Sequence, residues 1–271
     1  MPAINTNVAA LFAQQSLKVN ERNQSNAMRQ LSTGSRLNTA ADDAAGMAIG
    51  QNMTSQVRGL NQAVRNLNDG INMMQTAEGA LGETSNMLQR MRELAVQSAN
   101  GTYSADQRNY LQTEFVALSS QIGKIATDTK WNDQSLLSSA STFTYQAGKD
   151  TGQTVAVTVA AMTLTGLNIT AGITVSTTTT ANSSLATLDS AIGMVNNQRA
   201  TIGAGINQMT YAVDNLSNVA SNTAASRSTI MDTDYATAST QLSKTQIIQQ
   251  AATAMLAQAN QQPQAVLSLL K

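Results

Sequence analysis

The sequence predicts a mainly α protein: a long antiparallel coiled-coil helical bundle with a small β-hairpin element, and with the chain termini paired in a terminal helical domain. Three observations predict this fold. Two long stretches keep a heptad repeat of apolar residues, a short stretch between them alternates with period two, and both chain ends are free of charge.

The first long helix is predicted from an apolar repeat that begins at Met53. Its positions follow steps of four and three residues, and all but Glu78 are apolar. A period of 3.5 held over about four heptads is typical of a coiled coil rather than of an ordinary surface helix. We expect this helix to reach about Asn100, and Asn100 with Gly101 to form a left-handed C-terminal cap. The repeat consists of Met53, Val57, Leu60, Val64, Leu67, Ile71, Met74, Glu78 and Leu81.

The middle of the chain changes pattern. Ser104 and Gln107 predict a capping box for a shorter amphipathic helix that carries Leu111, Phe115, Leu118, Ile122 and Ile125. Alternation over residues 142–145 and 155–159 predicts two strands of a hairpin. The threonine-rich residues 176–184 predict a linker or surface loop without a packing role.

The heptad repeat then returns from Leu185 to Ala220, and only Arg199 interrupts it. Two long helices of the same period are expected to pack side by side. Gly203 and Gly205 lie within the second helix, where we expect them to permit close approach of helices. The repeat consists of Leu185, Leu188, Ile192, Val195, Arg199, Ile202, Ile206, Met209, Val213, Leu216 and Ala220.

Both chain ends lack charged side chains, over residues 1–17 and 245–270. Each end carries apolar residues at helical spacing, so we expect the two ends to meet and to expose apolar surface that favours association with other subunits. The alternative is a pair of frayed, disordered tails, and this is the state that we expect in the isolated monomer, because two thin helices alone offer little core. The apolar residues are Val8, Leu11 and Phe12 at the first end and Ile247, Ile248, Met255, Leu256, Val266, Leu267, Leu269 and Leu270 at the last.

Composition excludes several classes of function. Charged residues make up 12% of the chain, 16 positive against 16 negative, which suits assembly and disfavours a nucleic-acid partner. The chain has no Cys and no His, so we expect no enzyme activity, no metal site and no cofactor. Asp42 and Asp43 are adjacent and indicate a helix start rather than a catalytic pair. We expect neither a membrane span nor a cleaved signal peptide.

Several segments resemble bacterial flagellin. At the N-terminal end these are INTN at 4–7, LSTGSRLN at 31–38, AADDAAG at 40–46 and LQRMRELAVQS at 88–98. At the C-terminal end they are DYAT at 234–237 and MLAQANQQPQAVLSLL at 255–270. The departures are small: Ser35 stands where many relatives have Leu, and Ala41 where many have Lys. The short stretch 135–184 leaves no space for large outer variable domains, so the chain resembles a minimal flagellin.

The resemblance implies a structural subunit that polymerises into the helical flagellar filament for motility, outside the cell, after unfolded export by the flagellar type III system. Residues 1–42 and 231–271 would form the inner filament-core domain, and residues 43–230 the outer coiled-coil domain, with a β-hairpin region at about 135–175. The absence of Cys suits threading through an export channel. The residues expected to carry inner-core assembly are Val8, Leu11, Phe12, Leu256, Val266, Leu267 and Leu270.

The resemblance also implies partners other than the homo-polymer: an export chaperone at the C-terminal helix, and the filament cap and hook-filament junction proteins. A vertebrate innate immune receptor would bind a surface that includes Gln89, Arg90, Leu94 and Glu114. Ser and Thr residues within 138–184 are candidates for O-glycans. The alternative functions are a hook-filament junction protein and a secreted coiled-coil effector.

Overall fold

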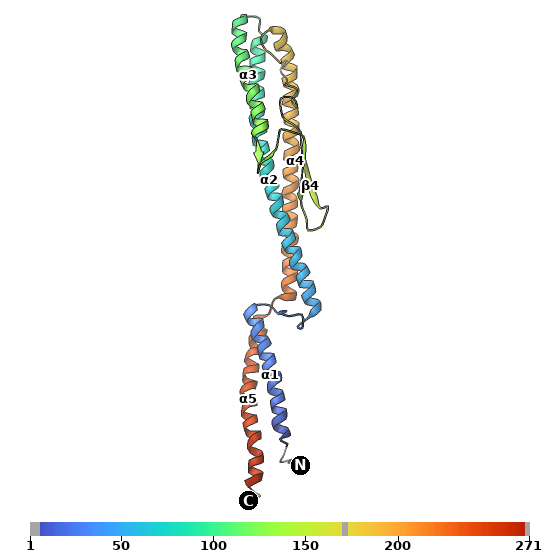
Figure 1. Ribbon diagram of the computed structural model, residues 1–271, viewed down its shortest axis with the longest axis vertical. Coiled ribbons are helices and arrows are strands. Elements are labelled where there is room, and N and C mark those ends of the chain that lie inside the picture. The colour runs from blue at the N-terminus through green and yellow to red at the C-terminus, as the bar shows by residue number, and fades with distance from the viewer. Residues whose placement is uncertain (1–5, 170–172, 269–271) are drawn as a thin grey trace. The chain divides into compact units, whose positions relative to one another are not determined.

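The computed structural model describes residues 6–169 and 173–268, with side chains up to residue 261. Five helices dominate it: α1 (Val8–Thr33), α2 (Ala44–Ala99), α3 (Ala105–Asp128), α4 (Thr178–Met231) and α5 (Tyr235–Ser268), as Figure 1 shows. The chain divides into two compact units, residues 56–221 and the two ends, 1–55 with 222–271. The unit boundaries fall inside α2 and α4, whereas we predicted domain limits at 42 and 231, close to the breaks between helices.

The two heptad helices pack in antiparallel fashion, as predicted. In the unit 56–221 the repeat positions of α2 and α4 are buried or half-buried, and Leu67, Leu81, Leu188 and Val195 are fully buried in one continuous core. Arg92 of α2 contacts Asp189 of α4 at 2.6 Å, while Glu78 contacts Arg199, so residue numbers fall on one helix as they rise on the other.

The C-terminus of α2 ends differently from our prediction. Neither Asn100 nor Gly101 has a left-handed backbone. Instead, the side chain of Arg108 in α3 donates hydrogen bonds to the carbonyl oxygens of Ser98 at 2.9 Å and Asn100 at 3.0 Å. A cation therefore caps the negative end of α2, which is favourable for the helix dipole.

The shorter helix α3 begins as predicted. Ser104 accepts a hydrogen bond from the backbone of Gln107, whose side chain accepts one from the backbone of Ser104, which completes a capping box. Phe115 and Ile122 point into the core and are buried. The apolar face of α3 thus covers the antiparallel pair.

The predicted hairpin is formed by β3 (Ser141–Gln146) and β4 (Thr154–Val159), which pair in antiparallel register with Phe143 opposite Val157. Every second residue of β4 is buried, which explains the period-two pattern. We did not predict the short hairpin β1 (Lys130–Trp131) and β2 (Gln134–Ser135). Its turn places Asn132 and Asp133 at φ values of 47° and 64°, a conformation that both residue types tolerate.

Residues 178–184 are helical, so the prediction of a loop over 176–184 was wrong for most of this stretch. The helix α4 begins at Thr178, because Thr177 and Thr180 exchange side-chain to backbone hydrogen bonds at 3.2 Å and cap its first turn. Ala181 is fully buried, and Ser184 donates a hydrogen bond to the carbonyl of Thr174 at 3.0 Å. Threonines that suggest a loop act here as caps.

We predicted that Gly203 and Gly205 permit the close approach of another helix, and this prediction was wrong. A Cβ atom at Gly205 would lie 2.6 Å from Cγ2 of Val157, so this glycine admits strand β4 and not another helix. A Cβ at Gly203 would meet no atom within 4 Å. Gly70 of α2 has a similar role, because a Cβ there would lie 2.8 Å from the ring of Tyr145 in β3.

Among the residues that the structure describes, no helix is long and apolar enough to cross a membrane. Within the same residues, no group of three or more acidic side chains is arranged to hold a metal ion.

Candidate assembly interface

The two chain ends form a helix pair, as predicted. Figure 1 shows α1 and α5 side by side, and their Cα atoms approach to within 8 Å of one another. Two asparagine amides tie the pair together, one at the N-cap of α1 and one within this helix. Asn7 donates to the carbonyl of Ala259 at 2.8 Å, and Asn20 donates to the carbonyl of Thr245 at 2.7 Å. The pair is therefore antiparallel.

Small residues fill the contact between these helices. On α1 the buried residues are Ala10, Asn20 and Ala27, and on α5 the buried residues include Ala238 and Thr245. Small side chains let two helices approach closely, but they bury little apolar area. The pair therefore has a thin core of its own.

The large apolar residues of the pair point outward instead. Phe12 is 74% exposed, and Ile247 and Met255 are each 67% exposed. Other large apolar residues of the pair with exposed side chains are Val8, Leu11, Val19, Tyr235 and Ile248. Monomeric proteins seldom expose so many large apolar side chains on one pair of helices, and such exposure marks interaction sites. We call these residues the outer apolar face.

The predicted assembly residues are placed as follows. Val8, Leu11 and Phe12 belong to the outer apolar face, and Leu256 is half-buried on α5. Leu270, and the side chains of Val266 and Leu267, lie outside what the structure describes. The two asparagine ties were not predicted, although an Asn directly before an apolar helical run is a signal for an N-cap.

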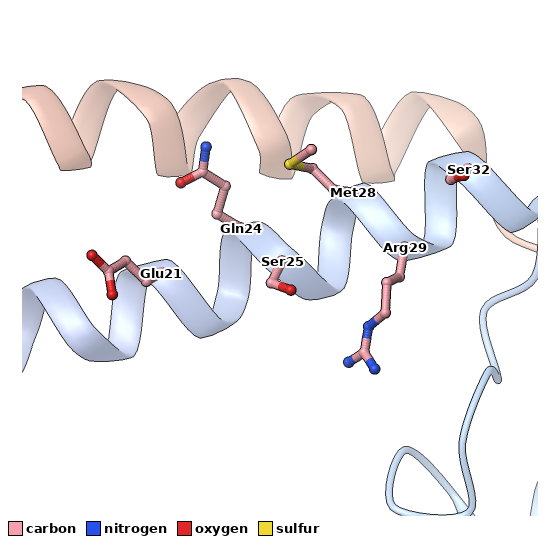
Figure 2. Close-up of a pocket in the computed structure, with 6 residues that line it drawn as sticks. All are labelled: Glu21, Gln24, Ser25, Met28, Arg29 and Ser32. Atoms are coloured by element: carbon pink, nitrogen blue, oxygen red, sulfur yellow. The ribbon is translucent and has the colours of Figure 1, made fainter.

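Surface grooves follow α1 in the part of the chain that the structure describes. One of about 440 Å³ combines Phe12, Val19 and Ile248 with polar neighbours. A second of about 540 Å³ runs beside Lys18 and Arg22. The third, of about 550 Å³, is shown in Figure 2, where Met28 lies on the side of α1 toward α5 while Arg29 points away; its lining residues are Glu21, Gln24, Ser25, Met28, Arg29 and Ser32. These grooves can receive side chains of another helix.

The segments that connect the end helices to α2 and α4 are also tied together. Ser35 forms a β-bridge with Asp232, and the Arg36 side chain donates to the carbonyl of Ile230 at 2.7 Å, which caps α4. Backbone hydrogen bonds, from Thr39 first and then from Asn38, lower the pKa of Asp42. Asp43 accepts from the backbone of Gly46 at 2.9 Å and starts α2, as predicted.

The predicted receptor surface on α2 and α3 is only partly on the exterior. Arg90 contacts Glu114 at 2.9 Å and Glu93 at 3.0 Å, and these hydrogen bonds raise the pKa of its guanidinium, with Glu114 the larger cause. Gln89 is exposed as well. Leu94, by contrast, is fully buried in the core, because it lies on the inward face of α2. Leu94 therefore supports this surface from beneath and does not form it.

A helix pair with small residues inside and large apolar residues outside defines a class: structural proteins that complete their core by packing against copies of themselves. Comparison with known proteins agrees. The family model for the bacterial flagellin N-terminal helical region matches residues 4–142, and the model for the C-terminal helical region matches residues 185–270. The chain therefore belongs to the bacterial flagellin family, whose members are structural subunits of an extracellular appendage, the flagellar filament.

Individual relatives cover the whole chain. It is 41% identical over 270 residues to a flagellin of Halalkalibacterium halodurans, and 37% identical over 284 residues to flagellin FlaB1 of Treponema pallidum, with 99% of each chain covered in both cases. The crystal structure of Bacillus cereus flagellin matches at a TM-score of 0.50 and 34% identity, over 60% of this chain and 94% of that one. The short middle of the chain agrees with relatives that have no large outer domain.

Proposed function

We propose that this chain polymerises into a long motility filament through the outer apolar face, after export by the flagellar type III system. The single observation that carries the proposal is the distribution of side chains in the helix pair α1 and α5. Small side chains fill the contact between the helices, whereas Phe12, Ile247 and Met255 are exposed to solvent. Burial of a large apolar side chain contributes about 1.5–3 kcal/mol. Several such residues per subunit supply the driving force for assembly.

Export in an unfolded state fits the composition of the chain. It contains no Cys, so no disulfide can obstruct threading through a narrow channel. The uncharged residues 245–270 would be exposed in the unfolded chain, and an export chaperone would cover this apolar segment before secretion. Filament cap and hook-filament junction proteins would meet the same outer apolar face at the two ends of the filament.

A vertebrate innate immune receptor is proposed as a partner of the surface around Gln89, Arg90 and Glu114. These three side chains are exposed and polar, and a salt bridge holds Arg90 in place. Leu94 would contribute to receptor binding indirectly, because its packing in the core holds α2 and the exposed side chains on it in place. Addition of the monomer to receptor-bearing cells tests this: activation by an Arg90→Ala variant at the level of the natural chain would contradict the assignment.

Seeded polymerisation of purified subunit tests the main proposal. We expect the natural chain to form long filaments by electron microscopy, and a Phe12→Ser variant to remain monomeric because it removes a large exposed ring from α1. The matched control is Tyr110→Ser, which removes an equally exposed ring from α3, outside the terminal pair. An equal loss with both variants would refute the assignment of assembly to the terminal helices.

The length of the polymer separates the rival functions. A hook-filament junction protein acts in a few copies, so a subunit that stops at short oligomers would favour that function over a filament. A secreted coiled-coil effector would show no seeded growth. Swimming of a flagellin-deleted bacterium restored by this chain, and lost with Phe12→Ser, is the expected result for a motility filament.

A further inference from the structure

The strongest unexplained feature of the terminal pair is a proline inside α5. Pro263 lies within this helix, whose last turn continues to Ser268. A proline has no N–H group, so it cannot donate the helical hydrogen bond to the carbonyl four residues earlier. That carbonyl belongs to Ala259, and it is the group that accepts the hydrogen bond from Asn7 Nδ2 at 2.8 Å. The asparagine supplies the donor that the proline lacks.

The other half of the same amide serves α1. The Oδ1 atom of Asn7 accepts a hydrogen bond from the backbone N–H of Ala10 at 3.0 Å and caps the first turn of that helix. One side chain thus satisfies a free donor at the start of α1 and a free acceptor in α5. Each half of the amide has a partner that would otherwise lack one within its own helix.

We propose that Asn7 and the gap left by Pro263 form a register clamp, which allows α1 and α5 to pair in one alignment only. Residue 263 is the only proline between 256 and 268, so every other residue in this stretch can donate its N–H group to the carbonyl four residues earlier. If the helices slipped, Asn7 would move away and the carbonyl of Ala259 would lose its donor. An unpaired, partly buried carbonyl is unfavourable. The clamp therefore selects the alignment that presents Phe12 and Val19 of α1 beside Ile248 of α5.

Asn20 provides the internal comparison. Its amide donates to the carbonyl of Thr245, but Gln249 has an N–H group that already serves this carbonyl within α5. The two ties are 20 − 7 = 13 residues apart on α1 and 259 − 245 = 14 residues apart on α5, about 20 Å on each helix at the standard rise. Both therefore fit one alignment, yet only the bond from Asn7 fills a gap in the partner helix.

The inference rests on the proposed assembly, and the test uses full-length subunit in equilibrium with its filaments. The free subunit concentration is measured for the natural chain, Asn7→Ser, Pro263→Ala and the double variant. Serine keeps the cap of α1 but is too short to reach α5. We expect Asn7→Ser to raise the free concentration by about 2- to 12-fold in the natural background. In the Pro263→Ala background, where residue 263 donates to Ala259 itself, the rise should be less than half as large.

Equal effects of Asn7→Ser in both backgrounds would overturn the clamp, since the asparagine would then act independently of the proline. Asn20→Ser is the matched control, and it should have the same effect with Pro263 and with Ala at that position. If the effect of Asn20→Ser depended on residue 263 as strongly as the effect of Asn7→Ser does, this result would also count against the proposal.

Two further measurements keep the outcome decisive. If Pro263→Ala does not polymerise, Asn7→Ser is compared with Asn7→Asp: aspartate is at least as good a cap, but it places a negative charge against the carbonyl of Ala259. The clamp predicts that Asn7→Asp is the worse of the two, and an aspartate variant equal to the natural chain refutes it. If the natural chain does not polymerise, the proposed function fails, and the same coupling is measured as amide hydrogen-exchange protection of α1 in the monomer.

Discussion

Arg199 of α4 donates a hydrogen bond from Nε to Oε1 of Glu78 in α2 at 2.9 Å, and its terminal nitrogen lies 2.7 Å from the same oxygen. The hydrogen bond to Glu78, and then the charge of Glu78, raise the pKa of the Arg199 guanidinium. The other carboxylate oxygen of Glu78 is buried and has no hydrogen-bond partner among the described residues. Glu78 and Arg199 are the two polar interruptions of the heptad repeats, and they meet.

This pair fixes the alignment of α2 against α4. A slip by one heptad would place each charge opposite an apolar residue, where it would lose its partner in a partly desolvated seam. We expect Arg199→Leu alone to lower the free energy of unfolding by about 1 kcal/mol, because the carboxylate of Glu78 then loses both nitrogens of Arg199 that contact it. The double variant Glu78→Leu with Arg199→Leu should recover that loss, since it continues the apolar seam.

Thermal unfolding of the full chain, followed by circular dichroism, measures both changes. A double variant as unstable as Arg199→Leu would show that the seam has no room for two leucines and that the pair is not the source of the loss.

The sequence predicted those parts of the fold that depend on local period. The heptads from Met53 and Leu185, and the strand alternation at Val155, each repeat over a few residues and are visible without a partner. The cap of α2 was not predictable in this way, because Arg108 returns to Ser98 only after α3 has folded back. We predicted that the chain ends expose apolar surface. The residues that form the outer apolar face could not be predicted, because they depend on which small residues of α1 and α5 pack against each other.

The burial of Leu94 was likewise not visible in the sequence. The resemblance implies that Leu94 belongs to a receptor-binding surface, yet this residue lies on the inward face of α2. We expect Leu94→Ala to lower the free energy of unfolding by about 2–5 kcal/mol through the cavity it leaves. Arg90→Ala, which changes an exposed side chain, should leave the unfolding midpoint nearly unchanged. Loss of receptor activation by Leu94→Ala would therefore need correction for the folded fraction, measured by urea titration.

A Leu94→Ala variant with natural stability would contradict the burial of this residue.

Two glycines of α4 should respond in opposite directions to the same substitution. At Gly203 an added Cβ meets no atom, so Gly203→Ala should stabilise the chain by about 0.5–1 kcal/mol through helix propensity. At Gly205 the added Cβ would lie 2.6 Å from Val157, and the shift of β4 should destabilise the chain by about 1–3 kcal/mol. Chemical unfolding of the two variants side by side measures this, and a gain from Gly205→Ala would show that the hairpin gives way easily.

Tyr145 should make unfolding sensitive to alkaline pH. Its ring packs beside Gly70, and its hydroxyl donates to the sulfur of Met73 at 3.4 Å. Burial raises the pKa of Tyr145 from 10.0 to about 12, since the half-buried phenolate would be poorly solvated. The folded state therefore holds this proton more tightly than the unfolded state. The resulting stability is fully present below pH 10.0 and is lost as pH rises toward about 12.

We expect Tyr145→Phe to reduce the fall in urea midpoint over that alkaline window, because phenylalanine keeps the packing and has no proton to lose. Tyr110→Phe is the matched control: Tyr110 is 75% exposed, so its removal should leave the alkaline fall unchanged. Ultraviolet absorbance of phenolate, recorded on the same samples, identifies the residue that titrates late. An alkaline fall of the same size in Tyr145→Phe as in the natural chain would place the pH-sensitive group elsewhere, and the packing of β3 against α2 would then have no part in it.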